Sequence, residues 1–195
     1  MKNLNKLSLI IALLLFTSIS SAQERVNKGD ATINIRITSS MSSGSDFINI
    51  YKRGTTVEII HRKFNRIDFE NVRVDTAYTN INFDPNVIDP QKLNKLRPIF
   101  DRHSVYDTTK VVINLKTDTA YQKILQLVAQ SGKQELETSK VGERLILDGF
   151  GFSGEIITNS DIKNISMRSP DAKSHPIVAA LLEESYNRLW KTRRK

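Results

Sequence analysis

The segment that decides the fold is Arg144–Leu189, RLILDGFGFSGEIITNSDIKNISMRSPDAKSHPIVAALLEESYNRL. Its apolar and β-branched runs, its glycine-rich centre and its amphipathic end predict, in order, a strand, a turn, a strand, a loop, a strand, a connector and a closing helix. We therefore expect a sheet with a C-terminal helix packed on it. Because strands also dominate the rest of the chain, the sequence predicts an α+β fold, mainly antiparallel, with about three helices.

The glycines of GFGFSG (149–154) have the G-x-G-x-x-G spacing of a dinucleotide-binding loop. That loop needs a helix directly after it, whose free N–H groups bind the pyrophosphate. Glu155–Thr158 is instead β-branched and predicts a strand. We interpret the segment as a glycine-rich hairpin, in which Asp148–Gly149 supplies a positive φ and Phe150 and Phe152 pack on one face. No cofactor is expected.

The N-terminus has the pattern of an export signal. Lys2 and Lys6 precede the apolar run Leu7–Ile19, and Ser20–Ala22 supplies the small residues of a cleavage site before Gln23. The chain contains no cysteine, so neither a lipid-anchored lipoprotein nor a disulfide is expected. No later apolar run is long enough to span a bilayer. The sequence therefore predicts export to the periplasm or to the extracellular space.

The mature chain, residues 23–195, has a length that suits a single α+β domain. The formal net charge of the full sequence is +8, and it falls to +6 without Lys2 and Lys6. Such a surface could contact anionic polymers or lipid headgroups of the cell envelope, although a solvated basic face is the commoner explanation. Nucleic acid is not expected as a partner, because export removes it and no nucleic-acid-binding motif is present.

Alternating residues predict an antiparallel meander in the first half of the mature chain. Ala31–Thr38 is expected to be a half-buried strand, with three isoleucines on one face: Ile33, Ile35 and Ile37. Further strands are expected, the first two joined by a tight turn, at Phe47–Lys52, Thr55–His61 and Lys110–Leu115. The segment Arg62–Thr79 is interpreted as additional β-type structure.

Three helices follow from capping residues and periodicity. The first begins with Asp89 as N-cap and Pro90 at the first helical position, and Pro98 predicts that it is short or kinked. Its apolar stripe is Leu93, Leu96, Ile99 and Phe100. The second follows Asp118 and ends at Ser131–Gly132. Its stripe is Ala120, Ile124, Leu127 and Val128, with Tyr121 and Leu125 alongside.

The third helix begins near Pro176 and is the amphipathic helix that closes the core. Its buried side is expected to hold Val178, Leu181, Leu182, Ser185 and Leu189. Glu183, Glu184 and Arg188 are expected on the opposite side. The polar segment Gln134–Glu143 is expected to be a connector.

Catalytic chemistry has no recognisable signature. The three histidines, His61, His103 and His175, are isolated from one another in sequence, and no helical metal-ligand spacing is present. Asp101 and His103 could share a metal or a proton, but a solvated helix terminus explains them better. A Ser-His-Asp triad stays open, because triads assemble from distant positions, but the absence of a G-x-S-x-G elbow argues against it. No catalytic, cofactor-binding or metal-binding residue is assigned.

The N-terminus and the Lys-, Asn- and Ile-rich composition resemble those of exported Bacteroidetes proteins. Three triplets match the short O-glycosylation motif of that group: Asp75–Ala77, Asp107–Thr109 and Asp118–Ala120. The resemblance implies that Thr76, Thr108 and Thr119 are candidate glycan acceptors. Asp118–Thr119 also reads as an ordinary helix N-cap, which would compete with that role.

The C-terminal third resembles small uncharacterised exported proteins of the same group. The similar elements are Leu147–Gly149, Arg168–Pro170, His175–Pro176 and the closing helix to Leu189. This resemblance implies no activity.

Three functions stay open from the sequence. The leading one is a secreted or periplasmic, non-enzymatic binding module of the cell envelope, whose partner is another envelope protein or an anionic polymer. The alternative is a hydrolase of envelope polymers, for which a deep cleft with converging His and carboxylate groups would be needed. The third is a structural protein whose basic surface lies against anionic lipid or polysaccharide, with salt-sensitive binding.

Overall fold

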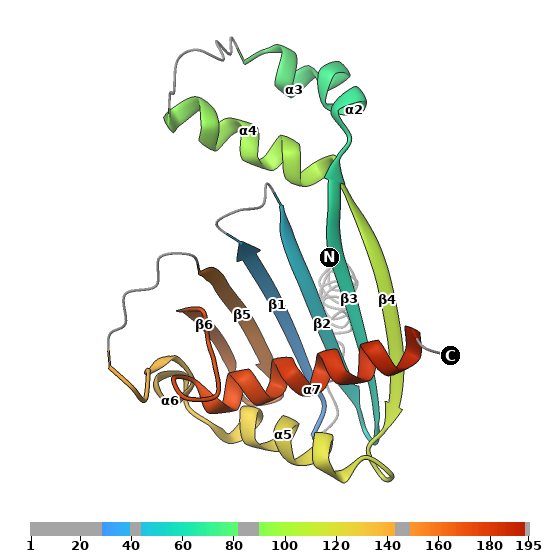
Figure 1. Cartoon of the computed structure of the whole chain (residues 1–195), viewed down its shortest axis with the longest axis vertical. Helices are drawn as coiled ribbons and strands as arrows, with labels where there is room; N and C mark the ends of the chain where they lie inside the picture. The colour runs from blue at the N-terminus through green and yellow to red at the C-terminus, as the bar shows by residue number, and fades with distance from the viewer. Residues whose placement is uncertain (1–28, 40–43, 82–89, 143–148, 194–195) are drawn as a thin grey trace, which may run out of the picture.

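The computed structural model describes residues 29–39, 44–81, 90–142 and 149–193, and within them six strands form one antiparallel sheet (Figure 1). The order across the sheet is β4-β3-β2-β1-β5-β6. The strands are β1 (Ala31–Ser39), β2 (Ser45–Arg53), β3 (Thr56–Ile67), β4 (Ser104–Asn114), β5 (Phe150–Thr158) and β6 (Ile162–Arg168). The predicted α+β class and antiparallel sheet are thus confirmed.

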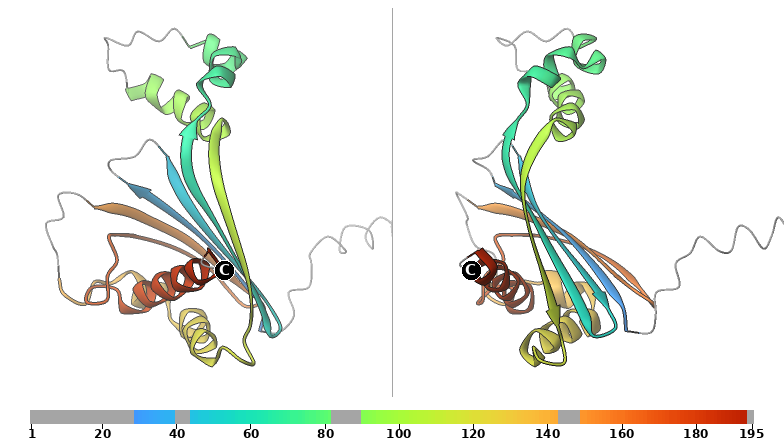
Figure 2. Two further views of the ribbon diagram at one scale, coloured as in Figure 1. Left: turned by 45° about the vertical axis from the view of Figure 1, so that its right-hand side comes forward. Right: turned by 90° about the vertical axis from the view of Figure 1, so that its right-hand side faces the viewer.

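Helices occupy two places relative to this sheet. The helices α2 (Phe69–Val74), α3 (Thr76–Thr79) and α4 (Pro90–Arg102) lie between β3 and β4 in sequence and sit at one end of that strand pair (Figure 1). The helices α5 (Thr119–Gln130) and α7 (Pro176–Arg193) lie on one side of the sheet (Figure 2). The short α6 (Lys133–Glu137) replaces part of the expected connector and packs beside β6. The described chain thus holds more helices than the three expected.

The sheet has an inner face, against which α5 and α7 pack, and an outer face. Strand alternation sets the inner face: Ile33 and Ile35 of β1 are 3% and 2% exposed, as predicted. The register continues this face into the neighbouring strands, because Ile33 is opposite Ile50 and Ile156, and Ile35 is opposite Ile48. Burial of these branched side chains between sheet and helices forms the main core.

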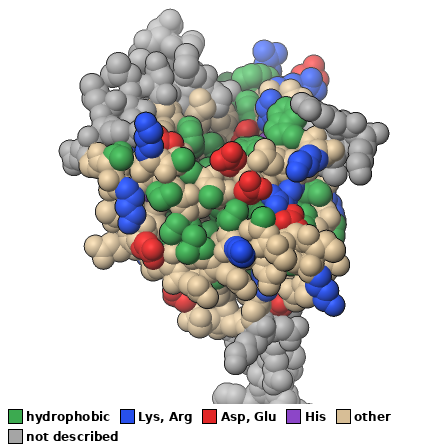
Figure 3. Space-filling view, turned by 60° about the horizontal axis from the view of Figure 1, so that its bottom comes forward, with side chains coloured by type: hydrophobic (Ala, Val, Ile, Leu, Met, Phe, Trp, Pro, Cys, Tyr) green, Lys and Arg blue, Asp and Glu red, His purple; other side chains and the backbone are tan. Residues whose placement is uncertain are grey.

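Helix α7 is confirmed as the closing element of this core. Its five predicted inward residues are all buried: Val178, Leu181, Leu182, Ser185 and Leu189. Helix α5 is also confirmed, but its buried side is rotated from the predicted stripe, since Tyr121, Leu125 and Val128 are buried whereas Leu127 is 46% exposed. Seen from the side of α5 and α7, apolar side chains lie among scattered charges (Figure 3).

Polar contacts join α5 to α7 and to the sheet. Asp118 caps α5 by accepting from the Tyr121 N–H at 3.1 Å, and both its oxygens accept from Arg188 of α7 at 2.7 Å. At the other end of α5, the buried Lys163 of β6 donates to the carbonyl oxygens of Ala129 and Ser131 at 2.6 and 2.8 Å. These carbonyls have no partner within their own helix, so the lysine satisfies them and complements the helix dipole.

The interpretation of Arg62–Thr79 as β-type structure is wrong beyond Ile67. Asp68 accepts from the Asn71 N–H at 3.2 Å and starts α2, and Asp75 accepts from the Ala77 N–H at 2.8 Å and starts α3. These aspartate caps favour helical turns over the β preference of the valines between them. Val72 of α2 packs with Leu96 and Ile99 of α4 in a second, smaller core.

Pro98 lies inside α4 and does not shorten it, since the helix has 13 residues. The start of α4 at Pro90 is confirmed, and the helix continues through Pro98 to Arg102. Pro98 removes the hydrogen bond to the carbonyl of Asn94, and both residues are exposed, so water can satisfy that carbonyl. Leu96 and Ile99 of the predicted stripe are buried and Phe100 is partly buried. The proposed cap Asp89 and the side chain of Leu93 lie outside the described residues.

The glycine-rich segment is a strand rather than the predicted turn. Residues 150–158 form β5, which pairs with β1 on one side and β6 on the other, so no helix follows the glycines and the dinucleotide interpretation is excluded. A Cβ on Gly154 would lie 3.3 Å from Ile165 Cγ1, so the glycine permits close packing across the sheet. Phe150 and Phe152 contact the same core, as predicted. The expected strand at 144–148 lies outside the described residues.

The hairpin between β5 and β6 has the polar turn expected at 159–161.

The predicted signal peptide, residues 1–22, lies outside the described residues. Among the helices that the structure describes, none combines the length and apolar character that crossing a membrane requires.

Candidate functional site

The outer face of the sheet carries the candidate site. No helix in the described part of the chain lies across this face, whereas α5 and α7 cover the inner one (Figure 2). Its side chains come from the alternate positions of each strand and are polar or aromatic in most places. This face, which no described helix covers, is available to a partner, because the main core of the protein lies on the other face.

Strand register arranges these side chains in two parallel rows that cross the sheet. The first, the amide row, contains Asn164, Glu155, Asn34 and Asn49, on β6, β5, β1 and β2. The second, the arginine row, contains Ser166, Ser153, Arg36, Phe47, Arg62 and Thr108, on all six strands. A row across six strands spans about 24 Å, because neighbouring strands lie about 4.8 Å apart.

A hollow of about 540 Å³ lies where the two rows cross β2, β1, β5 and β6. Hydrogen bonds organise the amide row within it: Asn49 Nδ2 donates to Asn34 Oδ1 at 2.8 Å, and Asn34 Nδ2 donates to Glu155 Oε2 at 3.2 Å. Lys133 and Glu137 of α6 form the rim beside β6. The row therefore presents fixed amide and carboxylate groups that can donate to and accept from hydroxyl groups.

The arginine row continues from the hollow onto β3 and β4. The guanidinium carbon of Arg62 lies 4.8 Å from the ring centre of Phe47 and 5.6 Å from that of Tyr106. Phe47 and Tyr106 meet edge to face at 5.7 Å, so the two rings form a fixed seat for the arginine. Arg36 lies 5.7 Å from the same Phe47 ring on its other neighbour strand.

Charges on this part of the face are mainly positive. Arg36 donates through Nε to Ser45 Oγ at 2.9 Å and lies 3.5 Å from the Asp101 carboxylate, so α4 shares this arginine. Lys110 of β4 is paired with Glu58. Arg62 has ring contacts, and no ion pair of its guanidinium group occurs within the described residues. It is the cation of this face that is best placed to accept an external anion.

The inner face carries a small titratable cluster beside the end of α7. His61 Nε2 lies 3.7 Å from Asp46 Oδ2, and the His61 ring meets Tyr186 edge to face at 5.3 Å, beside a hollow of about 150 Å³. Burial, with the nearby Asp46 carboxylate, raises the pKa of Tyr186 to about 12. The phenol is therefore neutral at physiological pH and poorly suited to act as a base or nucleophile. The exposed Trp190 borders this hollow.

A second hollow, of about 550 Å³, lies between α5 and the strand ends. Its floor is apolar, and Gln122, Gln126 and Gln130 of α5 lie along it with helical spacing. Lys52 and Lys116 lie at the strand ends, and Lys52 donates to the carbonyl oxygen of Gly29. The amide and ammonium groups of this hollow can donate hydrogen bonds to a ligand.

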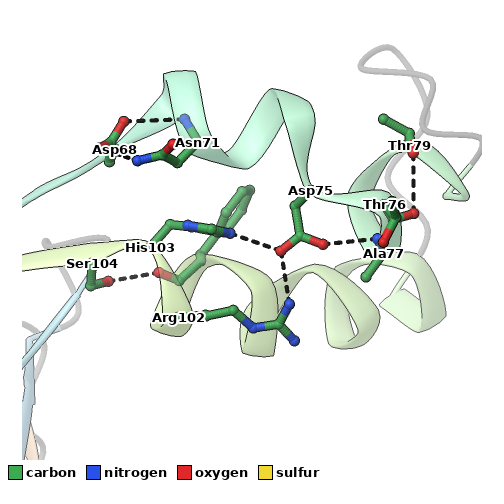
Figure 4. Close-up of polar contacts among 10 residues, drawn as sticks. Asp68, Asn71, Asp75, Thr76, Ala77, Thr79, Arg102, His103 and Ser104 are labelled. Atoms are coloured by element: carbon green, nitrogen blue, oxygen red, sulfur yellow. Dashed lines mark hydrogen bonds and ion pairs between the residues drawn. The ribbon is translucent and has the colours of Figure 1, made fainter.

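The other two histidines have structural partners. His103 Nε2 is 2.7 Å from Asp75 Oδ2, and Arg102 donates to the same oxygen at 2.8 Å (Figure 4). These contacts join α4 to the start of α3, and the His103 hydrogen bond, with that from the Ala77 N–H, lowers the pKa of Asp75. His103 thus faces Asp75, whereas Asp101 faces Arg36. His175 Nε2 contacts the Glu137 carbonyl oxygen at 3.0 Å.

The three predicted glycan acceptors are all exposed and lie apart. Thr76 and Thr119 are the first residues of α3 and α5, after the capping aspartates Asp75 and Asp118. Thr108 belongs to the arginine row and is directly opposite Arg62. The two Asp-Thr-Ala triplets are thus helix starts in this structure, whereas a glycan on Thr108 would lie on the candidate site.

The residues of the candidate site escaped sequence reasoning. The polar residues at the even-numbered positions of Ala31–Thr38 indicated one polar face of this strand. The sequence did not show which residues of the neighbouring strands lie beside them. Comparison of the chain with protein-family models, with curated proteins and with solved structures finds no match. The function must therefore be argued from the site itself.

Proposed function

We propose that this chain is an exported, non-enzymatic binding module of the cell envelope that holds an extended polysaccharide on the outer face of its sheet. The observation that supports it most directly is the amide row: Asn49, Asn34 and Glu155 are already hydrogen-bonded to one another inside an open hollow. Side chains that are fixed before binding lose little entropy when a ligand arrives. Export to the periplasm or the extracellular space, proposed from the N-terminal sequence, places the module where such polymers occur.

The shape of the site favours an extended polymer over a small molecule. The hollow is open to solvent, and the arginine row continues past it onto β3 and β4. Small-molecule sites usually enclose most of their ligand, which this hollow does not do. A chain lying across the strands could contact several row positions at once, so many weak hydrogen bonds would add up.

The groups in the amide row favour sugar hydroxyls over nucleic-acid phosphates. The Glu155 carboxylate lies at the centre of the row and would repel a phosphate backbone, but it accepts hydrogen bonds from hydroxyl groups. In nucleic-acid sites on open sheets, ring faces stack on bases. Here Arg62 occupies a position over the Phe47 and Tyr106 rings.

The alternative function, a hydrolase of envelope polymers, has one supporting observation. Asp46 and His61 approach to 3.7 Å beside the hollow near Tyr186. The pair lies on the inner face, away from the amide row, so a polymer on the outer face would not reach it. Binding without release of new reducing ends would support the module, and turnover that is lost in His61→Ala would support the hydrolase.

Binding to a panel of immobilised neutral and acidic polysaccharides tests the proposal. Asn49→Ala removes the donor to Asn34, and we expect affinity for a bound polymer to fall by about fivefold, since one hydrogen bond contributes about 1 kcal/mol. Asn187→Ala, an exposed asparagine of α7, is the matched control and should bind as the wild type does. Absence of binding to every polysaccharide, or equal binding by Asn49→Ala, would contradict the proposal.

A further inference from the structure

The arginine row differs from the amide row in one respect: it contains two cations and no carboxylate. Arg36 and Arg62 lie on either side of Phe47, opposite it on β1 and β3. In the amide row the corresponding positions are Asn34 and Ile60, and Glu155 follows on β5. Two parallel tracks, one able to bind hydroxyls and one cationic, therefore run two residues apart along each strand.

From this arrangement we infer that the polymer is an acidic polysaccharide, and that Arg62, with Arg36 beside it, binds the carboxylate of a uronic acid unit. The inference rests on the proposed function, because it names the ligand of the same face. A guanidinium group binds a carboxylate through two parallel N–H donors, which requires that the group be oriented. The Phe47 and Tyr106 rings provide that orientation for Arg62.

The orientation matters because a free arginine side chain is flexible. Contacts of 4.8 and 5.6 Å to two rings restrict the guanidinium group of Arg62, while the side chain stays exposed to solvent. A carboxylate can then bind without the cost of immobilising the arginine. Arg36 is partly engaged with Asp101, at 3.5 Å, and with Ser45, so it contributes a positive field more than a free pair of donors.

The position of Arg62 suits a polymer that is anchored in the hollow. Phe47 and Arg36 line the hollow and also belong to the arginine row, so the hollow and the Arg62 position are continuous. A sugar unit on the amide row therefore has a neighbouring unit within reach of Arg62.

The test compares polygalacturonate with its methyl ester, which keeps the sugar backbone but removes the charge. Wild-type protein should bind polygalacturonate at least about tenfold more tightly than the ester, with an affinity that falls as salt is added. Arg62→Ala should lose this preference and bind both polymers alike. Arg62→Lys keeps the charge without the two-pronged donor and should fall between them. Arg73→Ala, an exposed arginine of α2, is the control and should bind as the wild type does.

The outcomes separate this inference from the proposed function. Equal binding of polygalacturonate and its ester by wild type, with Asn49→Ala still impaired, would overturn the acidic-sugar inference and leave polysaccharide binding intact. Failure of wild type to bind any polysaccharide would overturn both. Displacement of polygalacturonate by a single-stranded oligonucleotide of higher affinity would overturn the inference in favour of a phosphate backbone. Unchanged thermal unfolding of Arg62→Ala would confirm that a loss of binding is not a loss of fold.

Discussion

The two faces of the same sheet use opposite chemistry. On the inner face Ile48, Ile50, Val57 and Ile59 are 0% exposed beneath α5 and α7. On the outer face the residues that alternate with them, such as Phe47 and Asn49, are only half-buried and contact polar or charged neighbours. Alternation thus divides each strand into positions that stabilise the fold and positions that are free to recognise a ligand.

The contrast between the two faces shows where a polar side chain can be placed without loss of folding stability. Inner polar groups have fixed partners, as with the Tyr121 hydroxyl, which lies 2.8 Å from Ser185 Oγ. Burial raises the pKa of Tyr121 to about 12, so the group stays neutral. Outer polar groups keep solvent contact and can exchange water for a ligand. The faces should therefore respond in opposite ways to substitution, with stability lost on one and binding lost on the other.

The largest effect is expected from Leu181→Asp. Leu181 is 2% exposed on the inward side of α7, so the substitution buries a carboxylate without a partner. We expect a loss of more than about 3 kcal/mol and an unfolded domain, measured by circular dichroism during thermal unfolding. Asn187→Asp introduces the same charge on the exposed side of α7 and should change little. An unchanged melting temperature of Leu181→Asp would show that α7 is not part of the core.

A smaller loss is expected from Asp118→Ala, which removes the cap of α5 and both bonds to Arg188. The side chain of Arg188 is 13% exposed and lies 4.4 Å from the Tyr121 ring, so the substitution would remove the Asp118 partner of a largely buried guanidinium group. We expect a loss of about 2 kcal/mol in urea unfolding, from the cap and the partly buried ion pair together. Asp161→Ala, in the exposed turn before β6, is the control.

The same aspartate predicts an acid dependence of stability. Hydrogen bonds from Arg188 hold the pKa of Asp118 below its ordinary value, despite some desolvation. Because the folded-state pKa is lower than the unfolded one, the contribution is complete above about pH 4 and is lost as the pH falls through the folded-state pKa. The unfolding free energies of wild type and Asp118→Asn should therefore converge as the pH is lowered from about 5 to about 2. A difference that is constant with pH would argue against this ion pair.

Periodicity and capping made the inner layer predictable from the sequence. The buried side of α7, the face of β1 and the cap of α5 are local patterns, since each depends on residues within a few positions of one another. The helices at 69–79 were missed because Phe69, Val72 and Val74 are residue types that favour strands. Asp68 and Asp75 nevertheless cap helical turns there. The full length of α4 was not predicted, because the cost of the hydrogen bond that Pro98 removes depends on exposure, which the sequence does not show.

The outer site was not predictable in the same way. Arg62 meets Phe47 and Tyr106 only because three strands pair in one register, and Tyr106 is 44 positions away from Arg62 in sequence. Single-sequence patterns place each of these residues on a strand but do not choose strand neighbours. The hollow similarly depends on β5 lying beside β1, a pairing between residues that are more than 100 positions apart. A site whose residues are brought together by strand register can therefore be identified only once the tertiary fold is known.

The smallest effect on stability is expected from Arg62→Ala. An exposed arginine over aromatic rings contributes about 0.5–1 kcal/mol, so the unfolding free energy should fall by less than about 1 kcal/mol. Ile59→Ala, on the same strand but on the inner face and 0% exposed, should cost about 2–5 kcal/mol because it leaves a cavity in the core. Urea unfolding of the two variants measures the contrast directly. A loss in Arg62→Ala as large as that in Ile59→Ala would mean that Arg62 stabilises the fold. That result would contradict the assignment of Arg62 to ligand binding.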